Sequence, residues 1–195
     1  MSCLTGAVGK IVLIRHGQTE WSRTARHTSV TDLELTADGE AQARRLARVL
    51  SEYRFGAVWC SPMRRALHTA RLAELEVTTV SADLGEWNYG RYEGISTAEI
   101  RQTEPHWTLW RDGCPDGESP EQVGKRLDNV LATVRPLLDT GDVALVGHGH
   151  ALRVAAARWL GLPVIGGALF GLSTASVSEL GHEREQPVIR KWNLS

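Results

Sequence analysis

Two apolar segments of the sequence each end on a histidine followed by a glycine. The run IVLI is followed by Arg15, His16 and Gly17, and the run ALVG is followed by His148 and Gly149. Continuous apolar runs are typical of interior strands in a parallel sheet, and ligands bind beyond the carboxyl ends of such strands. We therefore expect both histidines at one edge of a sheet, facing the same ligand.

Two further segments bring charge to the same edge. The run AVWC leads into SPMRRALHTA, which places Arg64 and Arg65 at the start of a helix, and DLGEWNYGRYEG places Glu86 in a glycine-rich turn. Clustered cations repel one another unless an anion lies between them. Arginine suits phosphate because its guanidinium binds two oxygens at once and stays charged. Each residue alone has an ordinary structural explanation, but together they indicate a phosphate site.

The elements that must position these residues alternate between strands and helices. This order predicts an α/β fold, a three-layer α/β/α sandwich with a mostly parallel central sheet. The last two apolar segments alternate with polar residues and favour one antiparallel edge strand. The expected strands cover residues 11–14, 57–60, 77–80, 142–147, 174–180 and 187–192.

Capping residues indicate where the helices begin. Thr36 is the expected N-cap of the first long helix, and Ser61 with Pro62 is expected to open the helix that carries the two arginines. Ser96 and Glu99 have the spacing of a capping box. Two more helices are expected, one from Ser119 that kinks or ends at Pro136 and one from Ala151 that stops at Gly161.

Length and composition describe an ordinary globular chain. Its 195 residues suffice for a substantial core, so we expect residues 1–195 to form a single domain. Residues 81–118 are irregular and rich in glycine and tryptophan, and we expect them to form a cap-like insertion over the site. The net charge of −1 argues against nucleic-acid binding, so any anion site must be a local cluster of arginines.

The number of cysteines and the N-terminal sequence indicate the cellular compartment. Cys3, Cys60 and Cys114 are few and odd in number, which argues against a disulfide framework and for a reducing environment. The opening MSCLTGAVGK is too short and too weakly apolar for a signal peptide, and no apolar run reaches a membrane-spanning length. We therefore expect a cytoplasmic protein without a membrane or nucleic-acid partner.

Four motifs then carry a family resemblance. RHGQTEW, SPMRRALHTA, GEWNYGRYEG and VGHGHALR occur in this order and together resemble the histidine phosphatase superfamily, which includes cofactor-dependent phosphoglycerate mutases and many phosphatases. The resemblance implies that His16 is the nucleophile that becomes phosphohistidine and that Glu86 is the proton donor. It places Arg15, Arg65 and His148 around the phosphoryl group. It also implies that the substrate pocket is lined by Gln18, Thr19, Ser22, Thr28, Tyr89 and Gly149.

The chemistry of these residues agrees with that role. A neutral His16 must attack phosphorus in line, and neighbouring arginines disfavour its imidazolium form. Arg15, Arg65 and His148, the last protonated when the anion is bound, would stabilise charge on the phosphoryl oxygens. Glu86, as a neutral acid, would protonate the leaving oxygen and then accept a proton from the attacking water. We expect no metal and no cofactor.

The segment after Glu86 favours a phosphatase over a mutase. Mutases of the family are generally longer and carry an Arg-His-Tyr-Gly run after this glutamate, whereas WNYG follows it here. Together with WRDGCPDGES, the motifs resemble a subgroup that contains fungal sedoheptulose-1,7-bisphosphatase and bacterial broad-specificity acid phosphatases. We expect a phosphomonoesterase that acts on a small phosphorylated metabolite, a sugar phosphate or bisphosphate.

The sequence defines the contacts to the rest of the substrate less closely than those to the phosphoryl group. Arg111 or His150 could contact a distal group of the substrate or serve only the structure. Ala25 and Ser29 stand where the family usually has glycine, in the loop expected to touch substrate. The expected partner is a small-molecule phosphomonoester, and a homodimer is an open alternative to a monomer.

Three other functions are open: a cofactor-dependent phosphoglycerate mutase, a non-catalytic phosphoprotein-binding module, and a metal site at His148-Gly149-His150. The clustered arginines oppose a divalent cation, and no carboxylate-rich ligand set accompanies these histidines. The presence of both His16 and Glu86 argues against a module that only binds.

Overall fold

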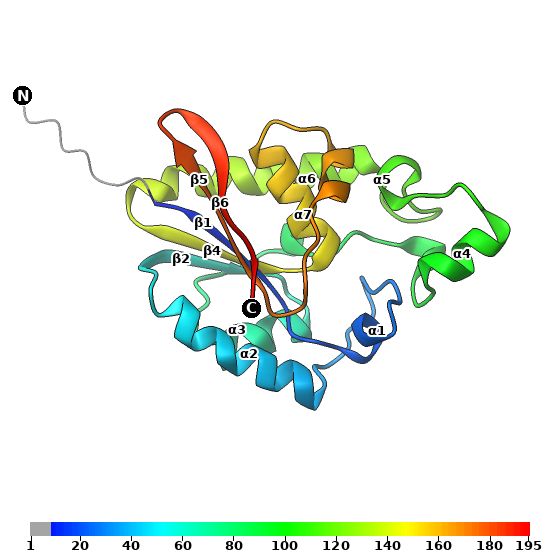
Figure 1. Ribbon diagram of the computed structural model, residues 1–195, viewed down its shortest axis with the longest axis horizontal. Helices are drawn as coiled ribbons and strands as arrows, with labels where there is room; N and C mark the ends of the chain where they lie inside the picture. Colours follow the sequence, from blue (N-terminus) through cyan, green and yellow to red (C-terminus); the bar gives the residue numbers. More distant parts are fainter. Residues whose placement is uncertain (1–8) are drawn as a thin grey trace, which may run out of the picture.

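The apolar runs of the sequence form a central sheet. The computed structural model describes residues 9–195, so the prediction for Cys3 lies outside the described residues. Within them, six strands pair in the order β3-β2-β4-β1-β5-β6 (Figure 1). Their bounds are β1 Ile11–Arg15, β2 Phe55–Cys60, β3 Thr79–Val80, β4 Asp142–Gly147, β5 Val177–Glu183 and β6 Gln186–Leu194.

The sheet is parallel except at one side. β1 pairs with β4, β4 with β2 and β2 with β3 in parallel. β5 runs antiparallel to β1 and to the outermost strand β6. The prediction of a mostly parallel sheet with antiparallel pairing at one edge is confirmed: β5 is the strand that reverses, and β6 forms the edge beside it.

Helices cover both faces of the sheet, which confirms the three-layer prediction (Figure 1). Leu46 of α2 and Ala66 of α3 pack with Val12 on one face, whereas Leu127 of α6 packs in the cluster of Leu13 on the other. Neighbouring residues of β1 point to opposite faces, so both faces can be buried. The helices are α1 Glu20–Arg23, α2 Ala37–Leu50, α3 Arg64–Leu72, α4 Thr97–Thr103, α5 Leu109–Asp112, α6 Pro120–Val134 and α7 Gly149–Trp159.

Most of the expected helix boundaries are confirmed. The Thr36 side chain accepts a hydrogen bond from Gly39 N and caps α2. Capping boxes join Ser96 to Glu99 at α4 and Ser119 to Gln122 at α6. Pro136 lies in the 3-10 turn that follows α6, and Gly161, at a φ of +74°, lies just beyond α7.

The prediction that Ser61 and Pro62 open the next helix is wrong. α3 begins at Arg64, and its N-cap residue Met63 makes no side-chain capping bond. The Ser61 hydroxyl is buried, lies 2.8 Å from His148 Nε2, and accepts from the N–H of Met63 rather than from one in the first turn of the helix. The chain needs three residues after β2 before it can turn into the helix.

Register places the two histidines side by side. Arg15 pairs with Gly147 across the β1–β4 ladder, and His16 N donates to the Gly147 carbonyl at 3.0 Å. His148 follows Gly147 directly in the chain. Both histidines therefore leave the sheet at the carboxyl ends of adjacent parallel strands, as expected.

Residues 81–118 extend past this end of the sheet as short helical segments joined by irregular backbone (Figure 1). They comprise the 3-10 turns η1 Ala82–Leu84 and η2 Gly90–Tyr92 and the helices α4 and α5. The core of this segment contains Trp87, Ile100 and Trp107, which pack in the same buried cluster as residues of α6 and α7. Among the helices of residues 9–195, none has the length and apolar character needed to cross a bilayer.

Candidate active site

A pocket opens where β1 and β4 end, between the loop after α1 and the start of α7. Its volume is about 320 Å³. Three arginines and a single carboxylate contribute to its walls, so its lining is cationic. The lining residues are Arg15, His16, Thr19, Ser22, Ala25, Arg26, His27, Thr28, Glu86, Tyr89, Thr97, Gly149, His150, Arg153 and Leu172.

His16 lies at the pocket wall in one defined tautomer. Its Nδ1 is 2.7 Å from the Gly17 carbonyl, which can only accept, so Nδ1 carries the proton and Nε2 keeps its lone pair. Burial, together with the positive charges of Arg15 and Arg65, lowers the pKa of His16 well below its usual value. The imidazole is therefore a neutral base with one free nitrogen, as a nucleophile requires.

The turn after His16 depends on glycine. A Cβ on Gly17 would lie 2.4 Å from the carbonyl oxygen of Gly39, so no side chain fits there. Gly17 N donates to Thr69 Oγ1 at 3.0 Å. These contacts bring the start of α2 and the middle of α3 against the residue that follows the nucleophile.

Arg15 offers a donor to the pocket. One of its terminal nitrogens donates to the carbonyl of Leu172. Its Nε is buried and has no hydrogen-bond partner in the described part of the chain. A buried N–H without a partner is costly, and an anion in the pocket would supply one.

Glu86 caps the helix that begins after His148. Its Oε2 accepts from His150 N at 3.0 Å, and its Oε1 accepts from Ala151 N at 2.8 Å and Trp87 N at 2.9 Å. A carboxylate is stabilised at a helix N-terminus because backbone N–H groups and the helix dipole face it. These bonds fix the carboxyl group in the pocket wall.

Arg65 and His148 lie behind the nucleophile and do not line the pocket. Both side chains are fully buried. The rings of His16 and His148 meet edge-on, with 5.1 Å between their centroids. The remaining nitrogens of Arg65 donate to the carbonyls of Thr31 at 3.0 Å and Ser29 at 2.9 Å, so its charge acts on His16 through space.

His148 is neutral in this structure. Arg65 Nε, which can only donate, lies 3.2 Å from His148 Nδ1, so that nitrogen accepts. Burial and the charge of Arg65 lower the pKa of His148 well below its usual value. The protonated form expected from the sequence therefore requires a bound anion to stabilise it.

Five of the six expected pocket residues line the pocket: Thr19, Ser22, Thr28, Tyr89 and Gly149. Gln18 does not, because its Oε1 accepts from Thr36 Oγ1 at 2.9 Å and so faces the start of α2. Thr19 and Ser22 form the capping box of α1, a short helix that the sequence analysis did not anticipate.

The two departures from the family pattern have structural explanations. Ala25 has a φ of +55°, a conformation that glycine adopts without strain. The Ser29 hydroxyl and backbone N bind the carboxylate of Glu93, which also accepts from Thr31 N at 3.0 Å. Glu93 thereby holds in place the carbonyls that receive Arg65.

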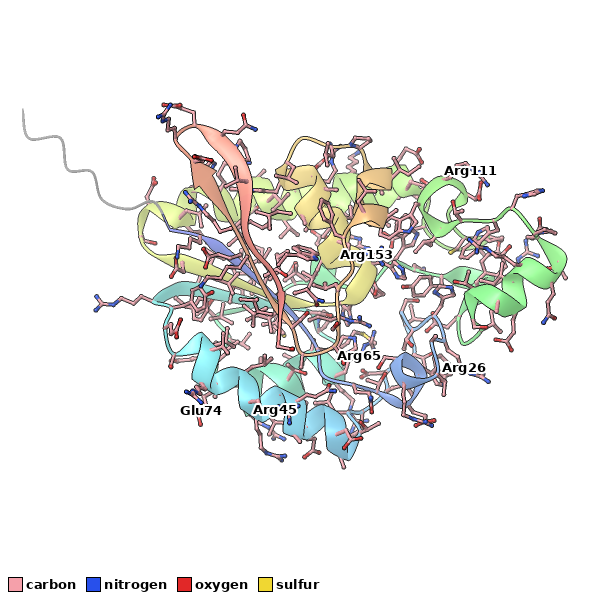
Figure 2. All side chains as sticks on the ribbon, in the orientation of Figure 1. Arg26, Arg45, Arg65, Glu74, Arg111 and Arg153 are labelled. Atoms are coloured by element: carbon pink, nitrogen blue, oxygen red, sulfur yellow. The ribbon has the colours of Figure 1, made fainter. Side chains whose placement is uncertain are left out.

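His150 enters the pocket, and Arg111 does not. His150 Nδ1 lies 2.6 Å from the Tyr89 hydroxyl. Arg111 pairs with Asp112 and borders a separate hollow of about 540 Å³ around Trp107. Figure 2 shows Arg111 on α5, above and to the right of Arg153 and apart from it.

Several residues that line the pocket were not predicted from the sequence. Among them, Arg153 could have been predicted from its spacing along the helix. Arg153 lies four residues after Gly149, one turn along α7 and on the same face. Its guanidinium lies over the Trp110 ring at 4.5 Å, with Nε donating to the Gly167 carbonyl at 3.0 Å. Arg26, His27 and Thr97 had no comparable signal, because they reach the pocket only through the way loops pack.

One wall of the pocket is neutral and able to form hydrogen bonds. The rings of His27 and Tyr89 lie 4.6 Å apart. Burial lowers the pKa of His27 to about 4, and burial with the charge of Arg153 lowers the pKa of His150 well below its usual value. Burial also raises the pKa of the Tyr89 phenol well above its usual value. All three side chains are uncharged at neutral pH.

The His148-Gly149-His150 pattern does not form a metal site. His148 faces Arg65 and Ser61, whereas His150 faces Tyr89. Across residues 9–195, no three histidine, cysteine or carboxylate side chains gather as ligands for a metal ion.

Comparison with known proteins agrees with this geometry. Residues 11–195 match the family described as the histidine phosphatase superfamily (branch 1). An acid phosphatase of Mycobacterium tuberculosis is 44% identical, with 89% of this chain and 87% of the relative covered. A sedoheptulose 1,7-bisphosphatase of Saccharomyces cerevisiae is 36% identical, with 80% and 69% covered. Phosphoglycerate mutases are also among the relatives.

A solved structure shares the whole fold. The product of an open reading frame of Mycobacterium tuberculosis superimposes with a TM-score of 0.94 at 41% identity, covering 96% of this chain and 98% of that one. The likeness extends over nearly the full length of both chains.

Proposed function

Because the chain belongs to the histidine phosphatase superfamily, we propose that it is a metal-independent phosphomonoesterase that works through a phosphohistidine on His16. One observation carries the proposal. A neutral His16 with a free Nε2 lies in the same pocket as a buried Arg15 N–H that has no partner in the described residues. A nucleophile and an unsatisfied cationic donor are what a phosphoryl group requires.

In the first step, His16 Nε2 attacks phosphorus in line. The N–P bond forms as the bond between phosphorus and the leaving oxygen breaks. The imidazole gains positive charge, which the hydrogen bond from Nδ1 to the Gly17 carbonyl stabilises. Arg15 binds the phosphoryl oxygens, while Arg65 contributes its positive charge from behind the nucleophile.

Glu86 transfers the protons. Glu86 begins the first step as the neutral acid and gives its proton to the leaving oxygen, which leaves a carboxylate. In the second step it accepts a proton from the water that attacks phosphorus, the N–P bond breaks, and inorganic phosphate leaves. Its hydrogen bonds to the start of α7 hold it at a fixed place in the wall for both steps.

The rest of the pocket supports a sugar phosphate or sugar bisphosphate as substrate. The neutral wall of His27, Tyr89 and His150 offers donors and acceptors that suit hydroxyl groups. Arg26 and Arg153 also line the pocket and add positive charge beyond that needed for one phosphate. A second anionic group on the substrate would pair with this charge.

The segment 81–118 has the role of a cap in this proposal. Glu86, Tyr89 and Thr97 all come from it and reach the pocket, so it closes one side of the site within a single domain of residues 1–195. The free thiols of Cys60 and Cys114 fit a reducing cytoplasm. A homodimer is the alternative to a monomer, and sedimentation distinguishes the two.

The test is phosphate release, in the presence of EDTA, from para-nitrophenyl phosphate, 3-phosphoglycerate, fructose-1,6-bisphosphate and sedoheptulose-1,7-bisphosphate. We expect release that survives EDTA, is lost in His16→Ala, and is unchanged in His106→Ala, which removes an exposed histidine. Denatured enzyme quenched during turnover should carry acid-labile phosphate on His16. Unimpaired release by His16→Ala would contradict the mechanism. Transfer of phosphate between glycerate positions without net release would support the mutase alternative.

A further inference from the structure

Ser61 belongs to a buried chain of hydrogen bonds beneath the nucleophile. Arg65 Nε lies 3.2 Å from His148 Nδ1, and His148 Nε2 lies 2.8 Å from Ser61 Oγ. All three side chains are fully buried. The chain joins the end of β2, the end of β4 and the start of α3, and the His148 ring at its centre touches the edge of the His16 ring.

The donors and acceptors present determine which atoms in this series of hydrogen bonds carry a proton. Arginine has no acceptor, so His148 Nδ1 must accept from Arg65 and carries no proton. A neutral imidazole then carries its proton on Nε2, whose hydrogen-bond partner within residues 9–195 is Ser61 Oγ at 2.8 Å. The hydroxyl oxygen therefore accepts from His148, and also from Met63 N at 3.4 Å.

The backbone explains why Ser61 stands in this place. Cys60 pairs with Val146 at the end of the β2–β4 ladder, and Ser61 N donates to the Val146 carbonyl at 3.0 Å. Ser61 thus continues the ladder one residue beyond β2, next to the point where β4 leads into His148. Pro62 follows at once and turns the chain toward α3.

We propose that Ser61 is a positioning residue, whose hydroxyl oxygen holds His148 in the Nε2–H tautomer and in place against His16. Without this acceptor, a buried N–H would have no partner, and the ring would be free to turn. Arg65 would lose a fixed acceptor at the same time. The effect on catalysis rests on the proposed phosphohistidine chemistry, but the tautomer of His148 does not.

The first measurement is therefore on the resting wild-type enzyme. Long-range ¹H–¹⁵N NMR distinguishes the two tautomers of His148 from each other and from the imidazolium. We expect an unprotonated Nδ1 and a slowly exchanging proton on Nε2. A proton on Nδ1 would overturn the proposal, whatever the enzyme does to substrates. Activity retained by His16→Ala would instead overturn the proposed function and leave the tautomer assignment standing.

Variants then connect the tautomer to the reaction. Ser61→Ala should lose the slowly exchanging Nε2 proton and lower kcat on the order of tenfold to a hundredfold, with a much smaller change in KM, because a nucleophile displaced within its site reacts poorly. Ser61→Thr keeps the hydroxyl and should restore both the NMR signal and kcat.

The matched control is Ser178→Ala. Ser178 is also fully buried, its Oγ accepts from Asn193 N at 2.9 Å between β5 and β6, and it does not line the pocket. It should lose stability comparable to that lost by Ser61→Ala and keep kcat. Equal kinetic losses in the two variants, or an unchanged His148 signal in Ser61→Ala, would refute the positioning role.

Discussion

The guanidinium of Arg15 packs closely against Gly149 and leaves little room for a side chain there. A Cβ on Gly149 would lie 3.2 Å from Cζ and 3.3 Å from Nε of Arg15. The same Nε is the buried donor that lacks a partner within residues 9–195. The glycine at the start of α7 therefore limits where this nitrogen, which we propose binds phosphate, can lie.

Gly149→Ala should weaken phosphate binding without unfolding the protein. Gly149 lies in α7 and has no positive φ, so alanine suits its backbone, but the tight contact with Arg15 offsets that gain, and stability should change by less than about 1 kcal/mol. The added methyl group displaces the Arg15 guanidinium. We expect KM and the inhibition constant of inorganic phosphate to rise on the order of tenfold. Steady-state kinetics and thermal unfolding measure the two effects.

The matched control is Gly171→Ala, since a Cβ there meets nothing within 4 Å. It should change neither KM nor the inhibition constant. A Gly149→Ala enzyme that binds phosphate as the wild type does would show that Arg15 Nε is not the phosphate donor.

Glu86→Gln should slow the reaction far more than it weakens binding. The amide cannot exchange protons, so we expect kcat to fall by roughly 10²–10⁴-fold. Its nitrogen must also face a backbone N–H at the start of α7, because the carboxylate accepts there from His150 N and Ala151 N in addition to Trp87 N. A stability loss of about 1 kcal/mol is therefore expected from urea unfolding.

Glu118→Gln separates the two effects. Glu118 also accepts from a backbone N–H, that of Asn88, and pairs with Arg126, but it does not line the pocket. It should lose stability and keep the kcat of the folded enzyme. If Glu86→Gln retained full kcat, another group would have to be the proton donor.

The edge of the sheet where the site forms could be predicted from local sequence. The apolar run 11–14, which precedes Arg15 and His16, favours an interior strand, and the similar run before His148 favours another that ends at the same edge. Register then brought the two histidines together. This much follows from burial and from the rule that ligands bind at the carboxyl ends of strands.

Other parts of the site depend on contacts between distant segments. Ser61 followed by Pro62 is typical of a helix start, and nothing nearby in the sequence shows that His148, far along the chain, needs the hydroxyl. Gln18 has the type of a pocket residue, but its amide is held by Thr36. Arg26 reaches the pocket only because of how the loop after α1 packs, which no periodicity reveals.

The buried histidines should make the fold less stable in acid. The pKa of His27 is lowered to about 4 from a usual value of 6.5. Between these pH values the unfolded chain binds more protons at this residue than the folded chain does, so stability falls as the pH falls from 6.5 toward 4. For His27 alone this gap corresponds to roughly 3 kcal/mol. The pKa values of His16, His148 and His150 are lowered too and act in the same direction.

His27→Gln should reduce this acid sensitivity. The amide does not titrate, so urea unfolding above pH 7 and near pH 4 should give a smaller difference in the free energy of unfolding than in the wild type. His106→Gln, at an exposed position, controls for the loss of an imidazole. An unaltered pH dependence in His27→Gln would mean that the folded protein accommodates the charged ring without cost.

Arg153→Met should change which substrates are preferred. Arg153 lines the pocket from α7, one turn beyond Gly149, and the methionine keeps most of its packing against Trp110 while removing the charge. If its guanidinium binds a second anionic group, kcat/KM for a bisphosphate should fall on the order of tenfold to a hundredfold, as expected for a lost charge-assisted hydrogen bond. The value for para-nitrophenyl phosphate, which has no second anion, should change little.

Arg111→Met is the comparison that makes this result specific. The sequence alone left Arg111 and His150 as equal candidates for a distal contact, but Arg111 pairs with Asp112 and borders a different hollow. Its removal should leave both kcat/KM values as they are. Equal losses for both substrates in Arg153→Met would assign that residue to the reacting phosphate rather than to a second one. The pocket would then favour a substrate with a single phosphate, bound through its hydroxyl groups on the wall formed by His27, Tyr89 and His150.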